Sequence, residues 1–543
     1  MTEAGRSSPG RAVPEPPGGP GWRQRAAAVA GSVPALVAAS LLGSALAFAN
    51  KAACWSGDWN TYLKQFQAHC YTDIYPLYFG EQLAAGRAPY TGHPVEYPVV
   101  IGGAMQAAAW LVRPISDPYA RGQAFFDVTI AGLAICTVAA VLATAQLAGP
   151  SRRWTALLVA LAPGLVLGSF INWDLIAVAL TALGMASWAS RRQVLGGVLL
   201  GLAVATKFYP LLFFGPLLLL CLRAGRVRPF LVTAGSAIVA WLVVNVPVAL
   251  AAPAGWARFY QLSASRPADW GSIWYFFESE HWPGLGTTSP GALNLLSLAV
   301  FMAGCAGLAL LILAAPRRPR VAQVYFLVLA VFLLSNKVWS PQYVCWLVPL
   351  VVLARPRLWS YLLWQAAEVG YFFAIWAYLI SVSLHGAAGA AAGGIGPGLY
   401  FTALLARFAA VALLCGLVVR DILCADQDPA AARDPAGGVL AAAADAWRLP
   451  LGVRPVTAQL AGSRSLSQRM SAPGSGVSQI TGAPAARTTS RMSPGSMVPV
   501  SRPAWRSRPE PNSSRELLQW IRSIRPVMDL ARSTMPARSS PPA

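Results

Sequence analysis

The sequence predicts an all-α polytopic integral membrane protein with about 12 transmembrane helices. Of its 543 residues, 56% are hydrophobic and only 12% are charged, whereas soluble globular proteins carry about 25% charged residues. Apolar runs of roughly 15 to 25 residues recur along the chain, which is the length that a helix needs to cross a bilayer. The net charge of +21 does not indicate nucleic-acid binding, because the arginines fall in short loops and in the tails rather than on one folded face.

The two ends of the chain differ from its middle. Residues 1–25 are rich in Gly and Pro, and Ser, Pro, Arg and Ala dominate residues 424–543. Such segments bury too little apolar surface to offset the entropy of ordering them, so we expect two disordered tails. Residues 26–423 form the transmembrane domain. Its first apolar run has no convincing cleavage site and is predicted to be an uncleaved first transmembrane helix.

The arginine-rich loops orient the apolar segments. The segments are 26–49, 98–113, 121–148, 154–170, 174–190, 194–206, 208–222, 229–252, 290–315, 321–335, 343–354, 358–382 and 399–419. The loop arginines are Arg152, Arg153, Arg191, Arg192, Arg223, Arg226, Arg228, Arg317, Arg318, Arg320, Arg355, Arg357 and Arg420. If every segment crossed, these loops and the N-terminal arginines would lie on opposite sides of the membrane. If 98–113 does not cross, all of them and both tails are cytoplasmic. We therefore predict that 98–113 is an interfacial or re-entrant helix.

The extracytoplasmic ends of the predicted spans hold most of the reactive side chains. The first outer loop, residues 50–120, contains Cys54 and Cys70. Outside the cytoplasmic membrane the environment is oxidising, which favours a disulfide between these two cysteines. Metal ligation is the weaker interpretation, because no histidine lies near them in a recognised ligand spacing.

Asp73, in the same loop, precedes a segment that suits an amphipathic helix along the membrane surface. A carboxylate beside an apolar interface can have a raised pKa and serve as a general base. The spacing alone favours the other interpretation, an N-cap of the following helix. Asp58 and Glu96 are further acids of this loop; Asp58 suits a turn, and Glu96 suits an anchor for the next segment.

Lys207 and Lys337 each follow a predicted span on its outer side. Lysines at such positions often only lift their ammonium groups to the lipid headgroups. Two outer lysines nevertheless depart from the positive-inside pattern, and cations near a carboxylate would suit a lipid-linked phosphate leaving group. Arg258, Arg266 and His281, in an aromatic-rich outer loop, are weaker candidates.

Glu368 and Arg407 lie well inside predicted spans. Charges within a membrane are costly and usually paired, so we predict an ion pair between them that is structural rather than catalytic. The sequence contains no convincing phosphate loop, dinucleotide fingerprint, HExxH motif or nucleophile elbow, and it gives no support to an ATP-driven machine.

Five short motifs occur in order on the predicted outer side. They are Asp73 with Tyr78, Gly86, Pro89 and Tyr90; Glu96-Tyr97-Pro98; Asn172-Trp173-Asp174; Lys207-Phe208-Tyr209-Pro210; and Lys337 with Ser340, Pro341, Gln342 and Tyr343. With these motifs, residues 26–423 resemble the polyprenol-phosphate-sugar-dependent glycosyltransferases of the GT-C superfamily. The chain is most similar to glycosyltransferase family 87, which includes actinobacterial mannosyltransferases.

The resemblance implies a GT-C-like fold with interfacial helices in the first outer loop and a catalytic aspartate there. It assigns that role to Asp73. Asp58 stays the alternative, because Asp73 follows the expected Cys54–Cys70 closure instead of standing directly beyond the first span. The donor phosphate and substrate are expected to contact Lys207, Tyr209, Lys337, Gln342, Tyr343, Glu96, Tyr97 and Asp174.

The reaction that the resemblance implies is transfer of a sugar, mannose first and arabinose as the alternative, from a polyprenyl phosphate. The acceptor would be an envelope lipid or glycan on the extracytoplasmic face, and direct displacement would invert the anomeric carbon. No metal or other cofactor is expected, because a lipid phosphate monoester leaves without a diphosphate-chelating ion.

Two other classes of function remain. A lipid or solute transporter or flippase would predict polar residues near the bilayer midplane and internal repeats. Only Glu368 and Arg407 lie at that depth, and the sequence has no clear halves. A non-catalytic scaffold for envelope assembly would leave Asp73 and both lysines freely replaceable.

Overall fold

The computed structural model describes residues 22–55, 62–428, 430 and 434–450. These residues belong to one compact unit, Met1–Val453, and the second unit, Arg454–Ala543, lies outside the described residues. Asp58 also lies outside them. Within the described ranges every regular element is an α-helix or a 3₁₀ helix, apart from an isolated bridge between Pro89 and His93. The prediction of an all-α protein is confirmed.

Six helices are long and apolar enough to cross a membrane. They are α2 (Val33–Trp55), α6 (Pro118–Ala148), α12 (Val227–Ala251), α15 (Pro290–Ala314), α18 (Leu358–Leu384) and α20 (Pro397–Leu423). At about 1.5 Å per residue, each exceeds the roughly 30 Å hydrocarbon core of a bilayer. Large apolar side chains on α12 and α15, such as Val243, Leu250 and Leu295, are exposed. Exposure of this kind is stable in lipid, and the chain is a multi-pass membrane protein.

Shorter apolar helices occupy most of the other predicted segments. They are α5 (Val99–Val112), α9 (Asp174–Ala189), α10 (Gln193–Thr206), η3 and α11 (Tyr209–Phe213 and Phe214–Arg223), α16 (Val321–Ser335), and η4 and α17 (Pro341–Tyr343 and Val344–Ala354). Segment 154–170 is broken into η2 (Pro150–Ala156), α7 (Leu157–Ala160) and α8 (Pro163–Gly168). Pro163 explains the break, because it forces Ala162 out of the helical conformation. The count of about 12 spans stays a prediction.

The N-terminal apolar run is also interrupted. It is divided between α1 (Trp22–Ala30) and α2, with Gly31 and Ser32 between the two helices. Gly31 packs against Arg153 and Trp154 of η2, so closely that a β-carbon would lie 3.0 Å from the Arg153 β-carbon. The first helix therefore bends where only a glycine fits beside the first arginine loop.

Small residues bring helices α10 and α12 together. A β-carbon on Gly197 or Gly201 would collide with the backbone carbonyls of Thr233 and Ala237 on α12. Such close approach is typical of helices in lipid, where packing rather than water exclusion drives association. It fixes α10, whose C-terminal end carries Lys207.

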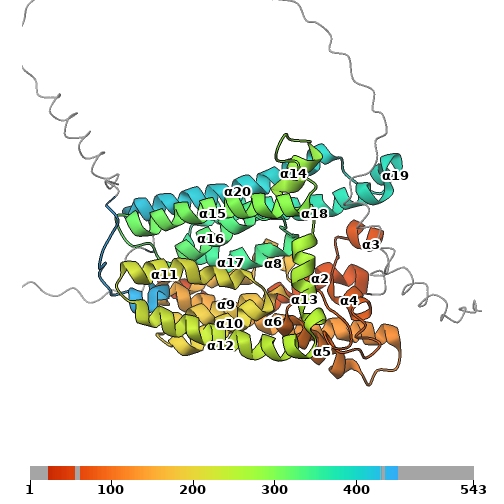
Figure 1. The fold of residues 1–543 in the computed structure, drawn as a ribbon, viewed down its shortest axis with the longest axis horizontal. Helices are drawn as coiled ribbons and strands as arrows, with labels where there is room; N and C mark the ends of the chain where they lie inside the picture. Colours follow the sequence, from red (N-terminus) through yellow and green to blue (C-terminus); the bar gives the residue numbers. More distant parts are fainter. Residues whose placement is uncertain (1–21, 56–61, 429, 431–433, 451–543) are drawn as a thin grey trace, which may run out of the picture. The chain divides into compact units, whose positions relative to one another are not determined.

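Short helices gather at one end of the bundle (Figure 1). They include α3 (Tyr62–Gln67), α4 (Ile74–Gly80), α14 (Ile273–Ser279) and α19 (Gly386–Ala391), and α13 (Pro253–Ser265) extends into the same region. Helix α4 buries Ile74, Tyr75, Leu77 and Tyr78. The Tyr78 ring stacks on Phe125 of α6 at 4.6 Å. The first outer loop thus folds into short helices that lie on the ends of the long ones.

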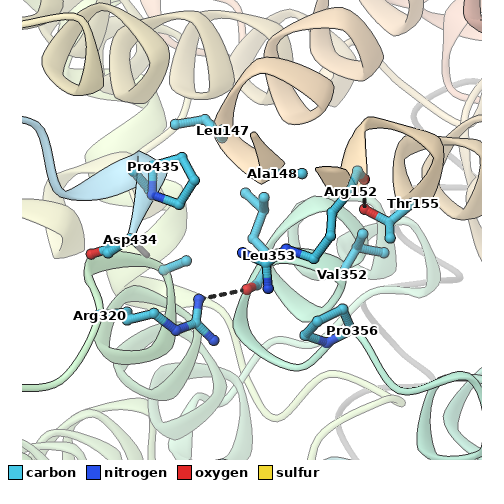
Figure 2. A pocket seen from close by; sticks show the side chains of 12 residues that line it. Leu147, Ala148, Arg152, Thr155, Arg320, Val352, Leu353, Pro356, Asp434 and Pro435 are labelled. Atoms are coloured by element: carbon cyan, nitrogen blue, oxygen red, sulfur yellow. Dashed lines mark hydrogen bonds between the residues drawn. The ribbon is translucent and has the colours of Figure 1, made fainter. Parts of the chain in front are cut away.

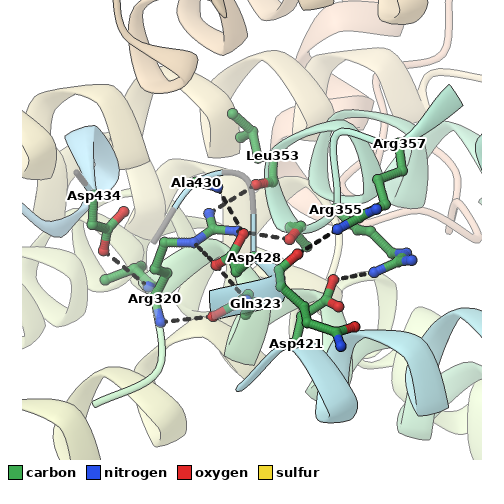
Figure 3. Close-up of polar contacts among 12 residues, drawn as sticks. Arg320, Gln323, Leu353, Arg355, Arg357, Asp421, Asp428, Ala430 and Asp434 are labelled. Carbon is green, nitrogen blue, oxygen red and sulfur yellow. Dashed lines mark hydrogen bonds and ion pairs between the residues drawn. The ribbon is translucent and has the colours of Figure 1, made fainter. Parts of the chain in front are cut away.

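Arginine loops and the C-terminal segment meet at the opposite end of the bundle. Arg320 donates to both carboxylate oxygens of Asp428, at 2.8 and 3.2 Å, and Arg355 forms a buried ion pair with Asp421 (Figure 3). Arg223 and Arg318 share Asp445, at 2.6 and 2.7 Å. Arginines from two loops and from the end of α11 are therefore neutralised by residues 421–445. This arrangement agrees with a common side for these loops, although the structure contains no membrane that would say which side it is.

The disordered C-terminal tail was predicted to start at residue 424, and the structure shows that this start was placed too early. Residues 434–450 were expected to be disordered, but they pack against the bundle, and η6 (Pro435–Leu440) buries Ala436 and Leu440. The composition did not reveal the reason, which is that Asp428, Asp434 and Asp445 each find a partner in the loops. Residues 451–543 of the predicted tail lie outside the described residues.

A pocket lies between these loops (Figure 2). Its lining includes Arg152, Thr155, Arg320, Leu353 and Asp434, with Arg320 donating to the Leu353 carbonyl at 2.9 Å. None of the predicted site residues lines it. A second cavity, between α6, α9, η3 and α17, is lined by Tyr209 and Trp346 together with apolar side chains.

Candidate active site

Asp73 lies in the connection between α3 and α4, which is fastened to the connection between α8 and α9. The Asp73 backbone N–H donates to the Ile171 carbonyl at 2.7 Å, and the Thr72 hydroxyl donates to the Phe170 carbonyl at 2.7 Å. Asp73 occupies the N-cap position of α4, but its side chain makes no capping hydrogen bond. The carboxylate is therefore available for other contacts.

Two tyrosine hydroxyls hold the Asp73 carboxylate. Tyr71 donates to Oδ1 at 2.7 Å and Tyr97 donates to Oδ2 at 3.2 Å. Burial, with a contribution from the nearby Glu96 carboxylate, raises the pKa of Asp73 to about 6, although both hydroxyls and Lys207 oppose the rise. At neutral pH the group is mostly ionised, yet it is a stronger base than an ordinary aspartate, which suits proton abstraction.

Lys207 lies beside one of these tyrosines, Tyr97. Its Nζ lies 2.7 Å from Oδ1 of Asp174, 5.3 Å from the centre of the Tyr97 ring and 5.8 Å from that of Tyr343. Burial lowers the pKa of Lys207, but Asp174, Tyr343 and Asp73 raise it above its ordinary value. Lys207 therefore keeps its charge close to the Asp73 carboxylate.

An aromatic stack supports Asp174 from the other side. Trp346 Nε1 donates to Asp174 Oδ2 at 2.9 Å. The Trp346 ring stacks with Tyr343 at 3.8 Å and with Tyr209 at 4.5 Å. Motifs from α9, α10 and α17, distant in the sequence, thus meet in one cluster with Asp73. Gln342, also among the predicted residues, is buried in η4 next to Tyr343.

Glu96 and Arg266 form the exposed edge of the cluster. Arg266 Nη2 lies 3.8 Å from Glu96 Oε2, and the Arg266 side chain is 45% exposed. The Glu96 backbone N–H donates to Glu81 Oε1 at 3.3 Å. Burial, with a contribution from Glu96, raises the pKa of Glu81 to about 7. A guanidinium with so loose a partner is well placed to exchange it for an anionic ligand.

The ammonium group of Lys337 has different partners from that of Lys207. Its Nζ donates to the carbonyls of Ala264 and Arg266, at 3.1 and 2.7 Å. These carbonyls lie at the C-terminal end of α13, where lysine side chains commonly complete the helix. Burial, with the nearby Arg266, lowers the pKa of Lys337. The structure therefore connects Lys337 with the backbone that carries Arg266 rather than with the carboxylate of Asp73.

Two further predicted pairs occur in the structure. A disulfide joins Cys54 of α2 to Cys70, with their Cα atoms 6.1 Å apart. Glu368 Oε2 lies 2.8 Å from Arg407 Nε, and both side chains are buried. Arg407 also donates to the Trp339 carbonyl at 3.1 Å. This second pair thus supports the segment that joins α16 to η4.

Sequence reasoning missed Tyr71, Trp346 and Lys51. Lys51 of α2 is fully buried and donates to the Tyr71 carbonyl at 2.8 Å. The sequence did contain a sign that Lys51 is unusual. A lysine near the outer end of the first apolar run breaks the positive-inside pattern, as Lys207 and Lys337 do. Tyr71 and Trp346 gave no such signal, since tyrosine and tryptophan are common at membrane interfaces whatever the function.

Within the described ranges, no three or more His, Cys, Asp and Glu side chains are grouped so that they could hold a metal ion. The cluster offers the half-buried Asp73 carboxylate, two phenols that orient it, the Lys207 ammonium close to it, and the Arg266 guanidinium at the exposed edge.

Comparison with known proteins identifies one family. Residues 118–341 match the family model of Glycosyltransferase family 87. No curated protein matches the chain. The matched range contains Asp174, Lys207, Arg266 and Lys337, while Asp73 precedes it. The resemblance to this family is thereby confirmed for residues 118–341.

Proposed function

Residues 118–341 form a glycosyltransferase family 87 domain in a multi-pass membrane protein, and on that premise we propose that Asp73 is the general base of the transfer. The donor is a polyprenyl-phosphate sugar, and the acceptor is an envelope lipid or glycan. The observation that carries the proposal is the Asp73 carboxylate, which two tyrosine hydroxyls orient beside Lys207 of the family domain.

The transfer proceeds as a single displacement. Asp73 takes the proton from an acceptor hydroxyl, whose oxygen attacks the anomeric carbon of the donor sugar. The bond from that carbon to the phosphate oxygen breaks, and the electron pair leaves with the polyprenyl phosphate. The proton remains on Asp73 until solvent removes it. Attack from the face opposite the phosphate inverts the anomeric carbon.

Cations stabilise the phosphate as its negative charge grows. Arg266 has the exposed guanidinium and a loose contact with Glu96, which suits direct contact with phosphate oxygens. Lys207, held by Asp174, supplies a fixed positive charge beside Asp73. Lys337 contributes by holding the end of α13 through the Ala264 and Arg266 carbonyls.

The donor sugar is proposed to be mannose, with arabinose as the alternative, on the resemblance to actinobacterial mannosyltransferases. The site is proposed to face the extracytoplasmic side, with both tails in the cytoplasm, on the positive-inside distribution of the loop arginines. The clustering of those arginines at the end of the bundle opposite the short helices supports this orientation (Figure 1).

The test uses the full chain in lipid nanodiscs with radiolabelled polyprenyl-phosphate mannose and an envelope lipid extract. We expect labelled product with an inverted anomeric centre, released polyprenyl phosphate in equal amount, and no product from the Asp73→Asn protein. Product from the arabinose donor alone would correct the sugar and keep the reaction. Near-normal transfer by Asp73→Asn would overturn the role of Asp73, and movement of the donor across the bilayer of sealed proteoliposomes without transfer would favour a flippase.

A further inference from the structure

Lys51 is a buried cation that the proposed reaction does not yet use. It lies near the outer end of α2, is fully buried, and donates from Nζ to the Tyr71 carbonyl at 2.8 Å. A neutral side chain such as glutamine would make the same hydrogen bond without the cost of burying a charge. Asp73, two residues beyond Tyr71, supplies a negative charge that favours the ammonium form of Lys51 against this cost.

The end of α2 around Lys51 is firmly fixed. Lys51 and Cys54 lie three residues apart and so share a face of the helix. Cys54 is joined to Cys70 by the disulfide, next to the residue that Lys51 contacts. Trp55 donates from Nε1 to Asp127 of α6 at 2.9 Å, and its carbonyl accepts from Gln123 at 2.8 Å. Lys51 thus projects from a rigid base towards the connection that carries Asp73.

Tyr71 joins Lys51 to Asp73. Its carbonyl accepts from Lys51, its hydroxyl donates to Asp73 Oδ1 at 2.7 Å, and its ring stacks on Trp376 of α18 at 4.7 Å. Because the backbone, ring and hydroxyl of one residue are all held, a displacement of its carbonyl would carry the hydroxyl away from the carboxylate.

We propose that Lys51 is a positioning residue for the base: through the Tyr71 carbonyl, it holds the Tyr71 hydroxyl and with it the Asp73 carboxylate in place. This inference rests on the proposed function in taking Asp73 as the base. It extends that function to α2, which lies outside the matched family domain and outside the motifs that carried the resemblance.

Other charged and titratable groups also face Asp73 and contribute to its pKa in the wild type and in the Lys51 variants. They are Tyr71 on its own connection, Glu96 and Tyr97 before α5, and Lys207 after α10. A substitution at Lys51 leaves the contacts of Glu96, Tyr97 and Lys207 in place, so a change in the titration of Asp73 would report the loss of the Lys51 contact with Tyr71.

The experiment measures the titration of Asp73 directly, without any sugar donor. The full chain in nanodiscs is labelled with a water-soluble carbodiimide, which reacts with protonated carboxyl groups, over a series of pH values. Mass spectrometry then quantifies the labelled peptide that contains Asp73. Because no transfer is measured, this readout stays valid even if the proposed donor or reaction is wrong.

In Lys51→Met we expect the labelling midpoint of Asp73 to rise by about half a pH unit or more, because displacement of Tyr71 weakens the hydrogen bond that favours the ionised form. Lys51→Arg, which keeps the charge, is expected to stay closer to the wild-type midpoint. Tyr71→Phe is expected to raise the midpoint as well, and it serves as the second variant if Lys51→Met does not fold. An unchanged midpoint in folded Lys51→Met, or in Tyr71→Phe, would overturn the proposal.

Discussion

The two ends of the helical bundle both contain buried charges, but they arrange them in opposite ways. At the arginine end, Arg320 and Arg355 are paired with Asp428 and Asp421 in direct, buried ion pairs (Figure 3). At the other end, Asp73 is bound by phenols instead of by a direct cation partner. Paired charges of the first kind fasten loops together, whereas a carboxylate of the second kind can still accept and release a proton.

Burial alone therefore does not identify a catalytic group. Asp428 accepts hydrogen bonds from Arg320, Gln323 and the Ala430 backbone, so protonating it would sacrifice several contacts. Asp73 has two neutral donors and partial exposure, and its pKa is raised to about 6. Substitutions at the two ends should have different effects. Those near Asp73 are expected to reduce activity, and those at the arginine end are expected to reduce stability.

The largest expected effect is on transfer by Asp73→Asn. Loss of a general base typically costs about 10² to 10⁴ in rate, and we expect kcat to fall in that range while the melting temperature stays near that of the wild type. Asp117→Asn is the matched control at the same end, because Asp117 only caps α6 by accepting from the Ala120 N–H and asparagine caps as well. Equal activity loss in both proteins would contradict the distinction.

At the arginine end, Asp428→Ala is expected to lower the free energy of unfolding by about 3 to 5 kcal/mol, because it leaves the Arg320 charge buried without its partner. Activity per folded molecule should not change. Asp426→Ala is the control, since the Asp426 contact with Arg317 is exposed and such pairs contribute about 1 kcal/mol or less. Thermal unfolding followed by tryptophan fluorescence compares the two. A similar loss in both variants would show that the buried pair is not what fastens this end.

The two outer lysines offer a comparison within the active end. Lys207→Met should reduce kcat/KM roughly 10- to 100-fold, the value of a charge-assisted contact of about 1.5 to 3 kcal/mol. Lys337→Met should reduce it less, because the Lys337 ammonium already has two carbonyl acceptors. Steady-state kinetics at varied donor concentration give both values. A larger loss of kcat/KM in Lys337→Met than in Lys207→Met would indicate that Lys337 contacts the phosphate directly.

The smallest expected effect concerns Glu368 and Arg407. We expect a double-mutant cycle of Glu368→Gln and Arg407→Met to show a coupling of about 0.5 to 3 kcal/mol in stability, because their side chains are directly paired. Measurements of unfolding on the wild type, both single variants and the double variant supply the cycle. Strictly additive losses would mean that the pair does not contribute as a unit.

Much of the fold could be predicted because composition and arginine placement are strong signals in a membrane protein. The apolar segments became helices, and the loops holding Arg223, Arg318, Arg320 and Arg355 met at one end. The break before Pro163 was present in the sequence but was not used. The packing of residues 434–450 was not predictable from composition, because it depends on which arginine each aspartate reaches.

The candidate site was only partly predictable. The motifs were expected to lie together because they share one predicted side of the membrane. The structure does bring together Asp73, Tyr97, Asp174, Lys207 and Tyr343. The different environments of Lys207 and Lys337 could not be inferred, since both are lysines at the outer end of a span. The difference depends on the course of α13. The carbonyls at its C-terminal end accept hydrogen bonds from Lys337, whereas Lys207 lies near Asp73.

The pH dependence of wild-type transfer tests most directly whether Asp73 is the base. The group must be ionised to accept a proton, and its raised pKa of about 6 predicts a rate that falls about tenfold per pH unit below that value and levels off above it. Glu81→Gln removes the neighbouring group with a pKa of about 7 and should leave this dependence in place. A rate that stays constant down to about pH 5 at saturating donor, or the same fall in the residual activity of Asp73→Asn, would contradict the assignment.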